Sequence, residues 1–80
     1  DRVYLTFDVD GLDAAVMPAT GTPEPGGLAF WQALDLVQEA VHGRTIIGLD
    51  VVELAPQSGL HFADFTAAKL TYLLMGIARP

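Results

Sequence analysis

The 80-residue sequence contains no cysteine, which excludes a disulfide framework and a thiolate nucleophile within this chain. Basic residues are also scarce, because four lysines and arginines stand against ten acids and the net charge is −6. A chain without a basic patch cannot neutralise phosphates well, so we expect no nucleic-acid partner. The apolar stretch at residues 70–78 is too short and too interrupted to span a bilayer, so we expect no membrane partner either.

Apolar residues, in contrast, are abundant. They make up 51% of the chain, and the mean hydropathy is +0.38, although a domain of this size ought to expose a large share of polar surface. The sequence begins at Asp1 without a methionine and is strand-like from Val3 onward. We therefore expect residues 1–80 to be the C-terminal fragment of a single larger domain, with some apolar faces packed on upstream parts.

The order of the predicted elements indicates an α/β fold. Residues 3–7 and 45–52 are uniformly apolar or β-prone and predict two strands buried on both faces, as in a parallel sheet. Apolar residues at helical spacing predict a helix from about residue 30 to residue 42, and a second from residue 65 to residue 77 capped by Asp64. Residues 11–27 hold four glycines and three prolines and predict an ordered loop. The sequence thus predicts a right-handed βαβ unit followed by one more helix.

Acidic residues follow both predicted strands. Asp8 and Asp10 end the first, and on a straight strand their side chains point to the same face; Asp50 and Glu53 end the second. Parallel strands end at one edge, where α/β proteins bind ligands, so we expect these four carboxylates to lie together. Converging carboxylate oxygens are typical of a divalent-metal or cation site, and solvated turn aspartates are the structural alternative.

Two longer motifs carry a family resemblance. Residues 6–10, Thr-Phe-Asp-Val-Asp, followed at the right spacings by Ala14, Pro18-Ala19 and Gly27, resemble the third signature of the ureohydrolases, the arginase/agmatinase family. Residues 48–56, Gly-Leu-Asp-Val-Val-Glu-Leu-Ala-Pro, are similar to the next motif of that family. The two motifs stand in the family's order, and the resemblance covers essentially the whole chain.

The resemblance implies a fold and a metal centre. The fold would be a three-layer α/β/α parallel sheet of the arginase type, of which this chain is the C-terminal βαβα part. Two Mn²⁺ ions would lie at the carboxyl edge of the sheet, with Asp8 and Asp10 as metal ligands and catalytic residues and the remaining ligands upstream. A hydroxide that bridges both ions would attack a guanidinium carbon and release urea and an amine.

The same resemblance assigns roles to three further residues. Glu53 would be catalytic and would bind the substrate's guanidinium group, because a carboxylate accepts its forked donors in pairs. Thr22 would hydrogen-bond the substrate or an intermediate, with a turn-forming role as the alternative. Asp50 would orient a metal ligand or the loop without touching the substrate itself. Asp13 is expected to anchor the loop.

Residues 23–27 and 59–65 resemble bacterial agmatinase-type members more than arginases. The expected substrate is therefore a small guanidino compound like agmatine, although arginine, guanidinobutyrate and formimino acids present a similar group. The resemblance further implies a cytoplasmic homo-oligomer, a trimer or a hexamer, in polyamine metabolism.

Two other interpretations stay open at this point. Residues 7–12 also resemble the opening motif of haloacid-dehalogenase-type phosphatases, where Asp8 would be the nucleophile, Asp10 the acid/base and Mg²⁺ the cofactor. That family usually has Thr or Val before the leucine that here is Leu12, and the loop at residues 21–27 has no place in it. The other interpretation is an inactive fragment that serves as an assembly module. Residues 1–80 alone are expected not to hold a working two-metal site.

Overall fold

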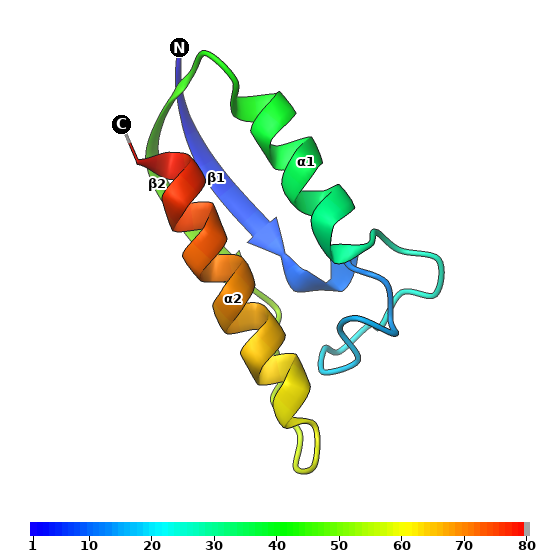
Figure 1. The fold of residues 1–80 in the computed structure, drawn as a ribbon. Helices are drawn as coiled ribbons and strands as arrows, with labels where there is room; N and C mark the ends of the chain where they lie inside the picture. The colour runs from blue at the N-terminus through cyan, green and yellow to red at the C-terminus, as the bar shows by residue number, and fades with distance from the viewer. Residues whose placement is uncertain (80) are drawn as a thin grey trace.

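The computed structural model describes residues 1–79, which contain two parallel strands and two α-helices (Figure 1). In chain order the elements are β1 (Arg2–Asp8), the 3-10 helix η1 (Val9–Gly11), α1 (Phe30–Val41), β2 (Thr45–Val52) and α2 (His61–Ala78). The two strands pair in parallel, with α1 between them along the chain. The predicted α/β class and order of elements are confirmed. Within residues 1–79, neither helix has the length and hydropathy that a membrane crossing demands.

The strands do not pair in one continuous register. Val3 pairs with Ile46, whereas the next residue, Tyr4, pairs with Gly48, so Ile47 is an extra residue in β2. Such a bulge changes the alignment of every pair that follows it. Beyond the bulge the register is regular up to the carboxyl ends of both strands.

One hydrophobic core joins β1 to both helices. β1 contributes Phe7, with Leu5 packed against the core, and α2 contributes the fully buried Leu70 and Leu74 from one helical face. The loop after β1 adds Leu12, which is also fully buried. The loop is therefore part of the packed structure and not a free connection, so its polar residues have fixed positions.

The other face of the sheet is open. Tyr4 and Thr6 alternate with the core residues of β1 and therefore point away from the helices. Tyr4 is 59% exposed and Ile47, the extra residue of β2, is 56% exposed. Within residues 1–79, both helices pack on the core side of the sheet (Figure 1).

One helix boundary agrees with the prediction and one does not. α1 ends at Val41, and Gly43 then adopts a φ of 75°, the left-handed conformation that commonly stops a helix. α2 begins at His61, about one turn earlier than predicted, and Asp64 lies in its first turn instead of capping it. The reason is Ala63, which is fully buried, so that the core-facing stripe of α2 starts at this small residue.

Candidate active site

Two of the predicted acids lie at the same edge of the sheet. Asp8 is the last residue of β1 and pairs with Val52, the last residue of β2. Glu53 follows Val52 directly, so Asp8 and Glu53 both lie at the carboxyl ends of the paired strands, one residue apart in the register. This edge is where a parallel sheet binds its ligands.

Asp10 reaches this edge by a route that differs from the prediction. β1 ends at Asp8, and the chain turns into η1 at Val9, whose side chain is fully buried. Oδ1 of Asp8 accepts a 3.0 Å hydrogen bond from the backbone N–H of Asp10, an aspartate turn that competes with a straight strand. The two residues are therefore neighbours because of a turn, and not because of strand alternation.

The loop then returns to Asp10 through Thr22. The hydroxyl of Thr22 donates a 2.8 Å hydrogen bond to Oδ2 of Asp10. Asp13 holds the loop in shape, since its two oxygens accept 2.9 Å hydrogen bonds from the backbone N–H groups of Ala15 and Gly26. The structure thus gives Asp13 the loop-anchoring role expected from the sequence and places Thr22 against a candidate metal ligand.

Glu53 has an unusual backbone conformation. With a φ of 74° it is the one non-glycine residue among those described that lies in the left-handed region, a conformation that costs about 1–2 kcal/mol. Its side chain is exposed, whereas the next residue, Leu54, packs against the core. The turn therefore keeps the carboxylate outside while the chain re-enters the fold. Conformations of this kind gather at functional sites.

Asp50 lies inside β2, two residues before the strand end, and not at the edge with the other acids. Its Oδ2 accepts a 3.2 Å hydrogen bond from the hydroxyl of Tyr4, and its Oδ1 accepts one from the hydroxyl of Thr6, its register partner. The negative charge of Asp50 is the main cause that raises the pKa of Tyr4, followed by partial desolvation and the hydrogen bond itself.

Sequence reasoning missed Tyr4 and Thr6 as partners of Asp50. A signal was present, because both have the same parity in β1 as Asp8 and therefore share the face opposite the core residues. Only the cross-strand register, with its bulge, shows that they meet Asp50.

The donor set fits part of a metal site. Carboxylate oxygens such as those of Asp8 and Asp10 suit hard or borderline divalent cations, and each carboxylate uses one oxygen in the hydrogen bonds described above. In the part of the chain that the structure describes, no three histidine, cysteine, aspartate or glutamate side chains are grouped as a metal site requires. A metal held by these two residues therefore needs further ligands.

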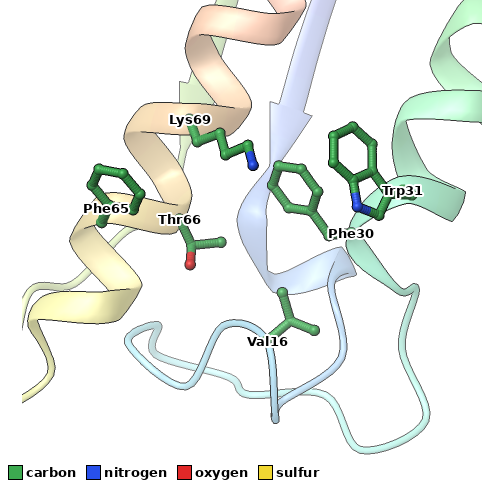
Figure 2. Close-up of a pocket in the computed structure, with 6 residues that line it drawn as sticks. All are labelled: Val16, Phe30, Trp31, Phe65, Thr66 and Lys69. Carbon is green, nitrogen blue, oxygen red and sulfur yellow. The ribbon is translucent and has the colours of Figure 1, made fainter.

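A separate cleft of about 310 Å³ lies between the start of α1 and α2 (Figure 2). Nζ of Lys69 lies 5.2 Å from the ring centroid of Trp31 and 5.8 Å from that of Phe30, at cation–π distances. The two rings meet edge to face, with centroids 5.1 Å apart. The remaining lining residues are Val16, Phe65 and Thr66, so the cleft contains none of the candidate acids.

Comparison with known proteins identifies the family of this chain. Residues 1–76 match the family model described as the arginase family. The chain belongs to the arginase family. An N(1)-aminopropylagmatine ureohydrolase from Synechocystis sp. is 45% identical over 94% of this chain and 24% of its own length.

Solved structures of relatives share the fold. The agmatine ureohydrolase of Thermoplasma volcanium superposes with a TM-score of 0.79 at 36% identity, over 96% of this chain and 26% of that one. A formiminoglutamase from Trypanosoma cruzi, solved with Mn²⁺, gives a TM-score of 0.75 at 29% identity, over 96% of this chain and 27% of that one. The α/β unit is thus a piece of the arginase-type fold, as predicted.

The chain spans about a quarter of the length of the relatives it matches. Membership in the arginase family confirms the resemblance carried by residues 6–10 and 48–56. It does not favour the phosphatase interpretation of residues 7–12.

Proposed function

We propose that the protein containing residues 1–80 is a ureohydrolase that converts a guanidino compound of the agmatine class to urea and an amine. The observation that carries this proposal is that Asp8 and Glu53 lie at the same carboxyl edge of the paired strands in a chain of the arginase family. Residues 1–80 would form the C-terminal part of a single domain, which is supported by the greater length of the relatives.

Asp8 and Asp10 would hold two Mn²⁺ ions together with ligands from other parts of the protein. The solved relative that contains Mn²⁺ supports this choice of metal. When bound, a pair of such ions supplies an activated water for attack on the guanidinium carbon. The hydrogen bonds from the backbone of Asp10 and from Thr22 restrict the two carboxylates, and an orientation fixed in advance favours metal binding.

Glu53 would bind the guanidinium group. A planar guanidinium presents parallel N–H donors that a carboxylate accepts two at a time. The exposed position of Glu53 just beyond β2 leaves both its oxygens accessible for such a pair. The chain's net charge of −6 also favours the approach of a cationic substrate.

Thr22 and Asp50 would have supporting roles. The Thr22 hydroxyl donates its hydrogen bond to Asp10, so it cannot donate a second one to the substrate. A guanidinium group carries only donors, however, and the lone pairs of the Thr22 oxygen can accept a hydrogen bond from one of its N–H groups. Asp50 would remain behind the site, because both its oxygens already accept hydrogen bonds from β1.

Relatives named for agmatine and for N(1)-aminopropylagmatine support a substrate that carries its guanidinium on an alkylamine. By the same family argument, the protein would work as a homo-oligomer.

Urea release tests the proposal. The intact protein, loaded with Mn²⁺, is assayed with agmatine, N(1)-aminopropylagmatine, arginine and guanidinobutyrate, and we expect urea and amine in equal amounts from at least one of them. Glu53→Gln keeps the size of the side chain but loses its charge, so kcat/KM should fall by about 10–100-fold, as for the loss of a charged hydrogen bond.

Glu24→Gln is the matched control, because Glu24 is an exposed loop glutamate whose backbone carbonyl, and not its side chain, accepts the hydrogen bonds described for it. We expect its kcat/KM to equal that of the wild type. Absence of urea with all four compounds, or equal rates for Glu53→Gln and the wild type, would contradict the proposal.

A further inference from the structure

Tyr4 lies across the neighbouring strand just beyond the bulge. It pairs in register with Gly48, and a Cβ atom at that position would lie 2.7 Å from Cε2 of the tyrosine ring. Such a distance is shorter than real contacts of this kind, so the ring can occupy this place only because residue 48 has no side chain. From there the Tyr4 hydroxyl reaches Asp50 at 3.2 Å.

These contacts identify one register out of several. β2 has the sequence Thr-Ile-Ile-Gly-Leu-Asp-Val-Val, which contains a single glycine and a single acid. A slip by one residue would place Ile47 or Leu49 beneath the Tyr4 ring and an aliphatic residue opposite Thr6. A slip would also turn the apolar side chains of β2 to the wrong face. The bulge interrupts the register between Val3 and Tyr4, so side-chain contacts after the bulge are needed to set the residue pairs from Tyr4 to Asp8.

The register controls the geometry of the edge. Asp8 belongs to β1, whereas Glu53 follows β2, so a slip by one residue would move the two relative to each other by about 3.3 Å. A guanidinium group held by Glu53 would then be displaced from its position relative to Asp8.

We infer that Tyr4 is a positioning residue for the proposed reaction. With Gly48 and Asp50 it fixes the register of β2 on β1, and so the place of Glu53 relative to Asp8. The inference rests on the proposed ureohydrolase function. It assigns to an exposed tyrosine, outside the acidic edge, control over how the substrate's guanidinium group is held.

Tyr4→Phe tests the inference in the intact, Mn²⁺-loaded protein, since this change removes the hydroxyl and keeps the ring. We expect KM for the guanidino substrate to rise about tenfold, as for the loss of one hydrogen bond to a charged group, with a smaller change in kcat. The Mn²⁺ affinity should stay at the wild-type value, because Asp8 and Asp10 are held by β1, η1 and the loop.

Tyr72→Phe provides the matched control. It is the other tyrosine of the chain, lies 75% exposed on α2, and should leave KM and Mn²⁺ affinity unchanged.

Gly48→Ala gives a second, independent variant. Its added methyl group should displace the Tyr4 ring and break the same hydrogen bond to Asp50, so KM should again rise. The double variant Tyr4→Phe with Gly48→Ala should then be no worse than the more impaired single variant, since both changes remove one shared contact.

Two results would overturn the inference while leaving the proposed function intact. One is urea release by Tyr4→Phe with the wild-type KM. The other is a rise in KM accompanied by a weaker Mn²⁺ affinity and a lower melting temperature, which would show a general destabilisation. If the wild type itself releases no urea from any guanidino compound, the proposed function fails first and this inference fails with it.

Discussion

The hydroxyl of Thr22 donates a 2.8 Å hydrogen bond to Oδ2 of Asp10, and so joins the middle of a long loop to the turn that follows β1. The ends of that loop are also closed, because the backbone N–H of Leu28 donates to Gly11 at 2.9 Å and that of Asp13 donates to Leu28 at 2.8 Å. Thr22 therefore orients a carboxylate from a fixed position.

Thr22→Val should weaken Mn²⁺ binding by the intact protein about tenfold, because the change keeps the shape of the side chain and removes the donor that orients Asp10. Thr22→Ser keeps the hydroxyl and should bind Mn²⁺ as the wild type does. Calorimetric titration of the two variants measures the difference. Equal affinities for valine and serine at this position would show that the hydrogen bond does not support the metal.

The ionisation of Tyr4 gives a pH dependence. Asp50 raises the pKa of Tyr4 above its usual value of about 10, so the folded state keeps the phenol proton when the unfolded state has lost it. The resulting stabilisation is complete below about pH 10 and is lost as the pH rises through the raised pKa.

Phenolate absorbance measured against pH checks this directly in the intact protein. Asp50→Asn removes the charge and should move the ionisation of Tyr4 to lower pH, whereas Tyr4→Phe should remove that titration altogether. A wild-type and an Asp50→Asn curve that coincide would contradict the assignment.

Lys69, the only lysine of the chain, joins α2 to the start of α1 through the rings of Trp31 and Phe30 (Figure 2). Lys69→Met keeps most of the side-chain stem and removes the charge, so it should lower the free energy of unfolding by about 0.5–1 kcal/mol. Lys69→Arg should retain the stability, because a guanidinium also stacks on aromatic rings.

The emission of Trp31, the only tryptophan of residues 1–80, reports on the same contact. It should shift in Lys69→Met and stay close to the wild-type spectrum in Lys69→Arg. An unchanged spectrum together with unchanged stability in Lys69→Met would show that this cation–π contact contributes nothing.

The sequence predicted the elements well where periodicity was strong. The strands and α1 agree with the alternation of β1 and the helical spacing after residue 30. The start of α2 was missed because Ala63, a small residue with a weak apolar signal, is the first core contact of that helix. An aspartate at position 64 looked like a cap, but local capping preference is weaker than the burial of a helix face.

The candidate site was predicted in part. Asp8 and Glu53 follow apolar strands directly, so their place at the edge could be inferred from a parallel βαβ unit. The turn at Asp10 could not be inferred in this way. It depends on a hydrogen bond from the backbone N–H of Asp10 to the side chain of Asp8, which competes with continuation of the strand. The placement of Asp50 also escaped prediction, since it depends on a register that the bulge at Ile47 sets.

Mn²⁺ binding by the intact protein tests the central claim most directly. Calorimetric titration should show two Mn²⁺ ions per subunit of the intact wild-type protein. The double variant with Asp8→Ala and Asp10→Ala should lose this binding. Asp35→Ala, which removes an exposed acid on α1, controls for the loss of negative charge and should bind as the wild type does. Unchanged Mn²⁺ binding in the Asp8 and Asp10 double variant would contradict the account.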